Sequence, residues 1–176
     1  MKLQNKNIVI TGAADGIGYA LANRINQESP NSLSLIDINE SVVSVANSLH
    51  ADSYTADVSD ENAFQEVLNQ IIDKNKSIDL FCSNAGIQQF GTLETSTDDW
   101  QKNWDVNVMS HIHASKVLIP QMQKQRSGYI LLTVSAAGLL NMPGALAYAT
   151  TKHAAMGLAE NLAIMYGNDG IKVSAL

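Results

Sequence analysis

The chain has 176 residues, of which 45% are hydrophobic and 16% are charged. These values are typical of one globular domain, and they exclude a disordered or fibrous chain. The formal net charge of −6 argues against nucleic acid and anionic lipid as partners, because no global positive field attracts them. We therefore expect one domain, residues 1–176, in which local groups hold any anionic ligand.

The cysteine content and the start of the chain indicate the compartment. Cys82 is the only cysteine, so neither an internal disulfide nor a zinc site built from cysteines is possible. The first residues lack the features of a signal peptide, and no apolar stretch has the length of a membrane span. The sequence predicts a cytoplasmic protein without a membrane partner, in which Cys82 packs as a small buried hydrophobe.

Apolar runs of strand length alternate with segments of helical periodicity. The expected strands are residues 7–10, 32–36, 53–55, 78–82 and 129–134, and the expected helices are residues 19–27, 40–49, 61–74, 100–125 and 147–166. Crossovers through helices give parallel strands, so this order predicts a doubly wound, Rossmann-like α/β sheet. Ligands of such sheets bind beyond the carboxyl ends of the strands.

A glycine-rich turn, residues 11–18, joins the first expected strand to the first expected helix. Glycines permit a tight turn and a close approach of a pyrophosphate, and the helix N-terminus offers free N–H groups. An ordinary strand-to-helix turn is the alternative. The sequence predicts a dinucleotide site whose first residues are Gly12, Asp15, Gly16, Ile17 and Gly18.

Asp37 closes the second expected strand, nineteen residues after Gly18. A carboxylate at this place accepts hydrogen bonds from the adenosine ribose and repels a 2′-phosphate. Asp15 adds negative charge, and neither Ile38 nor Asn39 supplies a cation. NAD is therefore predicted in preference to NADP. The alternative is that Asp37 only caps the next helix.

Tyr148 and Lys152 lie four residues apart on an expected helix, so they share one face. A phenol ordinarily ionises at about pH 10, and a nearby ammonium stabilises the phenolate. The pair therefore predicts an acid–base group. The alternative is that Tyr148 is an aromatic packed against Leu146 or Met142.

Ser135 follows an expected strand and precedes Tyr148 by thirteen residues. At the carboxyl edge of the sheet its hydroxyl can donate to a developing alkoxide, and loss of such a donor typically costs about 100-fold in rate. A turn residue is the alternative. No metal is predicted, because His111 and His113 point to different faces of a helix and His153 brings no partner ligand.

These segments together resemble the short-chain dehydrogenase/reductase family. Its TGxxxGxG pattern matches Thr11, Gly12, Gly16 and Gly18, and its YxxxK motif matches Tyr148 and Lys152. Further matches occur in the family's order at Asp57, Val58, Asn84, Ala85, Gly86, Asn107 and Ser135. The resemblance covers essentially the whole chain, which would end at about the sixth strand, without the family's C-terminal substrate lid and last strand.

The resemblance implies an NAD(H)-dependent oxidoreductase that transfers a hydride between nicotinamide and a secondary alcohol or carbonyl, with Tyr148 as acid–base. It also implies that Lys152 holds the nicotinamide ribose and that Asn107 holds a water linking Lys152 to solvent. A surface polar residue is the alternative for Asn107.

By the same resemblance Asp57 and Val58 contact the adenine, and Asn84, Ala85 and Gly86 border the cofactor. For Asn84 a structural role at the centre of the sheet is the alternative.

The resemblance also bears on assembly. The expected helices 100–125 and 147–166 correspond to those that pair between subunits in the family, which implies a homodimer or homotetramer. Residues 87–95 and 136–147 are expected to border the substrate. The second segment is mostly apolar and uncharged, which favours a hydrophobic or neutral alcohol. Two other functions stay open: an inactive nucleotide-binding or dimerising fragment, and a nucleotide-sugar epimerase or dehydratase, which needs a larger C-terminal substrate domain.

Overall fold

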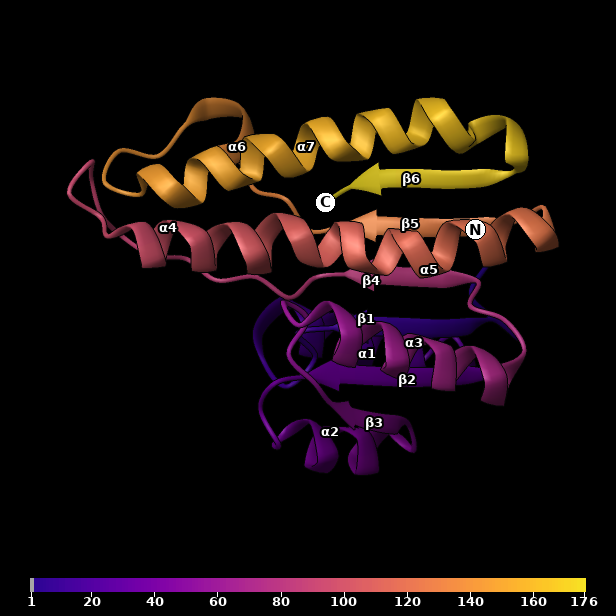
Figure 1. Ribbon diagram of the computed structural model, residues 1–176. Coiled ribbons are helices and arrows are strands. Elements are labelled where there is room, and N and C mark those ends of the chain that lie inside the picture. Colours follow the sequence, from indigo (N-terminus) through magenta and orange to yellow (C-terminus); the bar gives the residue numbers. More distant parts are fainter. Residues whose placement is uncertain (1) are drawn as a thin grey trace.

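The computed structural model describes residues 2–176, which form one sheet with helices on both faces (Figure 1). The strands pair in the order β3-β2-β1-β4-β5-β6, and every pair is parallel. The strands are β1 (Asn7–Thr11), β2 (Ser32–Asp37), β3 (Asp52–Thr55), β4 (Leu80–Ser83), β5 (Gly128–Leu132) and β6 (Ile171–Ala175). The predicted doubly wound α/β class is confirmed.

Helices form the crossovers between successive strands. They are α1 (Gly16–Asn26), α2 (Val42–Leu49), α3 (Glu61–Asn75), α4 (Thr97–Trp104), α5 (Ser110–Gln125), α6 (Ala137–Leu140) and α7 (Leu146–Tyr166). A π-helical turn, η1 (Asp105–Met109), joins α4 to α5, and a 3₁₀ turn, η2 (Gly167–Asp169), precedes β6. In the part of the chain that the structure describes, no helix is both long and apolar enough to cross a bilayer.

Two apolar clusters fill the layers between the sheet and its helices. The helices α3, α5 and α7 contribute to one cluster, and α1 and α2 contribute to the other. Successive side chains of a strand point to opposite faces, so Val9 enters the first cluster while Ile8 and Ile10 enter the second. This burial on both faces explains why β1 is apolar at nearly every position.

The long helix expected over residues 100–125 is wrong as a single element. It begins earlier, at Thr97, because the Ser96 hydroxyl accepts a hydrogen bond from the Asp99 N–H at 3.1 Å and caps α4. It is then interrupted by η1, which the spacing of the apolar residues does not predict. The helix expected from residue 40 begins at Val42, and the strand expected to residue 134 ends at Leu132.

The order of the strands fixes where a ligand can bind. Strand β1 lies between β2 and β4. After β1 the chain forms β2 and β3 on one side of it, and it then crosses to the other side to form β4, β5 and β6. Crossovers on the two sides leave a crevice beyond the carboxyl ends of β1 and β4, which is the usual ligand position in open sheets of this class.

Candidate active site

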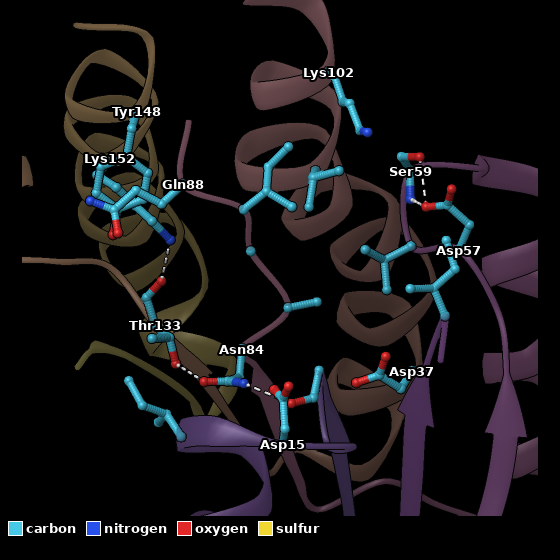
Figure 2. A pocket seen from close by; sticks show the side chains of 18 of the residues that line it. Asp15, Asp37, Asp57, Ser59, Asn84, Gln88, Lys102, Thr133, Tyr148 and Lys152 are labelled. Atoms are coloured by element: carbon cyan, nitrogen blue, oxygen red, sulfur yellow. Dashed lines mark hydrogen bonds between the residues drawn. The ribbon is translucent and has the colours of Figure 1, made fainter. Parts of the chain in front are cut away.

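A cavity of about 570 Å³ lies beyond the carboxyl ends of the central strands (Figure 2). Its volume is within the range of small-molecule and cofactor sites. The predicted site residues that line it are Gly12, Asp15, Ile17, Asp37, Asp57, Val58, Asn84, Ala85, Gly86, Tyr148 and Lys152. Four predicted residues do not line it: Gly16, Gly18, Asn107 and Ser135.

The glycine-rich turn allows two backbone segments to approach closely. Gly12 has φ +65°, and a Cβ on it would lie 2.8 Å from the Ala85 Cα, on the segment that follows β4. A Cβ on Gly18 would collide with the Gly12 carbonyl oxygen. These two glycines therefore let α1 and the end of β4 meet at the floor of the cavity.

Asp37 connects the end of β2 to the glycine-rich turn. Its Oδ2 accepts a hydrogen bond from the Ala14 N–H at 2.9 Å, and its Oδ1 accepts one from the Asn39 N–H at 2.9 Å. The next helix, α2, begins only at Val42, with Ser41 in the capping position. Asp37 is thus not the cap of α2, and lone pairs on both oxygens remain for a ligand.

Negative charge is concentrated at the same end of the cavity. Asp57 follows β3, and its Oδ1 accepts hydrogen bonds from the Ser59 N–H at 2.9 Å and the Ser59 hydroxyl at 2.7 Å. Asp15 and Asp37 also line the cavity. Lys102 of α4 also lines the cavity, and Figure 2 shows its ammonium directed toward Ser59.

Tyr148 and Lys152 lie together at the other end, on the first turns of α7 (Figure 2). The Lys152 Nζ is 5.7 Å from the centroid of the Tyr148 ring and donates a hydrogen bond to the Thr133 carbonyl at 2.9 Å. Lys152 is only 3% exposed, and this burial lowers its pKa from the usual 10.5 to about 8. An amine in this environment can exchange a proton near neutral pH.

Asn107 is fully buried within η1, so the alternative of a surface residue is excluded. Its amide donates to the Ile87 carbonyl at 2.9 Å and to the Thr151 hydroxyl at 3.1 Å, while its Oδ1 accepts from the Ile87 N–H at 2.8 Å. A Cβ on Gly86 would lie 3.2 Å from the Asn107 Oδ1 and 3.4 Å from the Lys152 Nζ. Asn107 therefore sets the path of the chain beside Lys152, and π-helical turns of this kind are frequent at functional sites.

The side chain of Asn84 holds the sheet together at the floor of the cavity. Its amide donates to the Thr11 carbonyl at 3.1 Å, and its Oδ1 accepts from the Thr133 hydroxyl at 3.0 Å (Figure 2). The Thr11 hydroxyl in turn accepts from the Asn84 and Ala85 N–H groups at 2.9 and 3.0 Å. These contacts match the structural alternative for the Asn84 side chain.

Ser135 lies where the chain leaves β5 and turns into α6. Its Oγ accepts a hydrogen bond from the Ala137 N–H at 3.1 Å, as a turn residue does. Because the oxygen acts there as an acceptor, the hydroxyl proton remains available to another partner.

Burial also disfavours the charged forms of Cys82 and His111. Burial raises the pKa of Cys82 to about 12, so the expected packing role of this thiol is confirmed. Burial, with a smaller contribution from the charge on Lys152, lowers the pKa of His111 to about 3. Within residues 2–176, no group of three His, Cys, Asp or Glu side chains is placed to hold a metal ion.

Comparison with known proteins places this geometry in a family. The profile of the short chain dehydrogenase family matches residues 6–176. This chain belongs to that family. The short-chain dehydrogenase described here is 34% identical to the meso-2,3-butanediol dehydrogenase of Serratia marcescens, over 100% of this chain and 71% of the relative. It is also 31% identical to a 3-oxoacyl-[acyl-carrier-protein] reductase of Thermotoga maritima, over 100% and 74% of the two chains.

Solved structures agree with the sequence relatives. The structure of an NAD⁺-bound xylitol dehydrogenase superposes on this short-chain dehydrogenase with a TM-score of 0.94 at 31% identity, over 99% of this chain and 70% of the other. A family member from Burkholderia phymatum in complex with NAD gives 0.93 at 31% identity, over 99% and 66%. The chain is thus an oxidoreductase by family, and the alternative of an inactive fragment is not favoured.

Several residues that line the cavity of this short-chain dehydrogenase were missed by sequence reasoning. They are Ile38, Ala56, Ser59, Lys102, Val106, Thr133 and Val134. Most of them adjoin a predicted motif residue at the end of a strand, which is a signal that was present in the sequence. Lys102 and Val106 come from α4 and η1, whose approach to the cavity depends on the packing of the whole chain.

Proposed function

We propose that this short-chain dehydrogenase uses NAD(H) to interconvert a secondary alcohol and the corresponding carbonyl compound. The observation that carries the proposal is one continuous cavity with carboxylates at one end and Tyr148 with Lys152 at the other. The similar proteins support the substrate class, because two of them are named for 2,3-butanediol and xylitol, which are secondary alcohols. A cytoplasmic location is part of the same proposal.

The residues present fit an NAD molecule. The close approach at Gly12 gives a pyrophosphate access to the turn and to the N-terminus of α1, and Asp37 has free lone pairs for the adenosine ribose hydroxyls. Asp57 and Val58 would border the adenine. NADP is disfavoured because Asp15, Asp37 and Asp57 would repel its 2′-phosphate. When bound, NAD(H) supplies or accepts the hydride.

The proton transfer is assigned to the other end of the cavity. In the direction of reduction, Tyr148 donates its phenolic proton to the carbonyl oxygen, and in oxidation the phenolate takes the proton back from the alcohol. Lys152 stabilises the phenolate and holds the nicotinamide ribose, while Thr133 fixes the position of its amine. Ser135 does not line the cavity itself but follows the lining residue Val134, and we assign to its hydroxyl a hydrogen bond to the same substrate oxygen. Such a donor strengthens as charge develops there.

Asn107 is proposed as a positioning residue with one remaining acceptor. Both amide protons are used by Ile87 and Thr151, whereas one lone pair of Oδ1 is left on the side of Gly86 and Lys152. We assign to this oxygen the water that links Lys152 to solvent.

Assembly as a homodimer or homotetramer through α4, α5 and α7 is also proposed. In support, α7 exposes Ile164 and Met165 at its C-terminal end, and Trp104 of α4 is partly exposed. Exposed large apolar side chains on long helices are typical of subunit contacts.

The proposal is tested by titrating the purified chain with NADH and by measuring the oxidation of a panel of secondary alcohols with NAD⁺, for the wild type and for Tyr148→Phe. We expect similar NADH affinities and a loss of about 10³-fold in kcat for the variant, since the phenol is the acid–base group. Equal turnover by both proteins would refute the role of Tyr148. Absence of NADH binding would refute the cofactor assignment.

A further inference from the structure

One polar side chain at the Tyr148 end of the cavity has no role in the proposed proton transfer. The lining residues that Figure 2 labels at this end are Gln88, Thr133, Tyr148 and Lys152. Thr133 and Lys152 bond to each other, and Tyr148 is assigned to the reacting oxygen. Gln88 is the remaining polar side chain, on the segment that follows β4 (Figure 2).

The amide of Gln88 is available to a ligand. Its Nε2 lies 3.4 Å from the Sδ of Met142, and a thioether is a weak hydrogen-bond acceptor. Within residues 2–176, its Oε1 accepts no hydrogen bond. A substrate oxygen can therefore replace the Met142 contact at little cost and gain a stronger bond.

The backbone around Gln88 is held on both sides. The Ile87 N–H and C=O are both bonded to Asn107, as described above. The Gly91 N–H donates to the Gly144 carbonyl at 2.7 Å, and the Leu146 N–H donates to the Gly91 carbonyl at 3.2 Å. Because Leu146 begins α7, the segment that carries Gln88 is tied to the helix that carries Tyr148. Such support on rigid elements is what a specificity contact requires.

The charges at this end restrict the kind of group that Gln88 can receive. Lys152 donates to the Thr133 carbonyl and is otherwise assigned to Tyr148 and the nicotinamide ribose, and Figure 2 shows the Lys102 ammonium directed toward Ser59. An anionic substituent would thus lack a free cation. An amide both donates and accepts, so it suits a neutral hydroxyl as well as a carbonyl.

From this geometry we propose that Gln88 forms a subsite for a second, neutral oxygen next to the reacting carbon. The preferred substrate is then a vicinal diol or the corresponding hydroxyketone, and a mono-alcohol of the same carbon skeleton is a poor one. The inference rests on the proposed function, because it assumes that Tyr148 binds the reacting oxygen. It adds a specificity residue that the proton transfer does not need.

The test compares 2,3-butanediol with 2-butanol as substrates for the wild type, Gln88→Leu and the control Gln70→Leu. Leucine removes the amide while keeping a similar volume, and Gln70 lies on the exposed surface of α3. We expect the wild type and the control to prefer the diol by at least about tenfold in kcat/KM, since a site that bonds a hydroxyl rejects the analogue without it. Gln88→Leu should lose that preference, because its kcat/KM for the diol falls toward the value for 2-butanol.

An equal loss for both alcohols in Gln88→Leu, or an unchanged preference, overturns the inference while leaving the proposed function intact. If NADH binds but neither alcohol is turned over, the proposed function fails. The subsite is then tested by the binding of the two alcohols to the protein. In that case, 2,3-butanediol should raise the melting temperature of the wild-type NAD⁺ complex more than 2-butanol does. In Gln88→Leu the two alcohols should raise it by the same amount. Equal shifts in the wild type would overturn the subsite as well.

Discussion

Asp37 shows how one carboxylate can serve the fold and a ligand together. Its oxygens bind the Ala14 and Asn39 N–H groups, and the same oxygens line the cavity. We expect Asp37→Ser to weaken NADH binding by about tenfold and to bring the affinities for NADH and NADPH closer, because both a ribose acceptor and a repulsive charge are lost.

The measurement is the ratio of the two dissociation constants, obtained by fluorescence titration. Asp73→Ser is the matched control, since it removes the same charge from the exposed surface of α3. An unchanged ratio in Asp37→Ser would contradict the assignment, even if both affinities fell.

Lys152 makes the stability of the protein depend on pH in the alkaline range. Its pKa is about 8 in the folded chain and near 10.5 when unfolded, so the unfolded state binds more protons between these values. The contribution of Lys152 to the free energy of unfolding therefore rises as the pH increases from about 8 to 10.5. It is lost as the pH falls through about 8. The difference corresponds to about 3 kcal/mol at most.

The check is the free energy of unfolding of the wild type and of Lys152→Met from pH 7 to pH 10.5. We expect the wild type to gain stability relative to the variant as the pH rises. If the free energies of unfolding of the two proteins change with pH in parallel, burial does not lower the pKa of Lys152.

At the scale of elements, the π-helical turn η1 is the feature with the largest consequence for the site. It places Asn107 in the interior, where one side chain bonds both backbone groups of Ile87 and the Thr151 hydroxyl. We expect Asn107→Ala to lower the free energy of unfolding by about 3 kcal/mol, because several buried polar groups lose their partners.

The measurement is chemical denaturation, with Asn161→Ala as control. Asn161 lies on the exposed side of α7, where its amide bonds only the Gly157 carbonyl one turn earlier, so a change within about 0.5 kcal/mol is expected. Similar losses in the two variants would mean that η1 is not held by Asn107.

The elements themselves were largely predictable, and the failures have physical reasons. The apolar runs identified five of the six strands, most clearly β1 and β4, which are covered on both faces. The sixth strand was expected from the family resemblance. The turn η1 was not predicted, since the insertion of a π-helical turn leaves the helical spacing of apolar residues nearly unchanged. The helix α6 has four residues, which is too short for a period to be recognised.

At the scale of the whole molecule, the motif residues of the cavity were predictable, but most of the other residues that line it were not. Gly12, Asp37 and Tyr148 lie at strand ends or a helix start, where chemistry follows directly from sequence position. Lys102 and Val106 reach the cavity only because α4 and η1 cross above the sheet. The link between Gly91 and Ala145, which ties the Gln88 segment to α7, joins residues far apart in the sequence. No local pattern predicts such a contact.

The central claim is that this cavity carries out transfer of a hydride together with a proton from Tyr148. The most direct measurement is reduction of 3-hydroxy-2-butanone by the purified chain with NADH dideuterated at C4 of the nicotinamide, followed by mass spectrometry of the product. We predict one deuterium at the new carbinol carbon with the wild type and a loss of about 10³-fold in the rate with Tyr148→Phe. A product without deuterium, or an equal rate in the variant, would contradict the account.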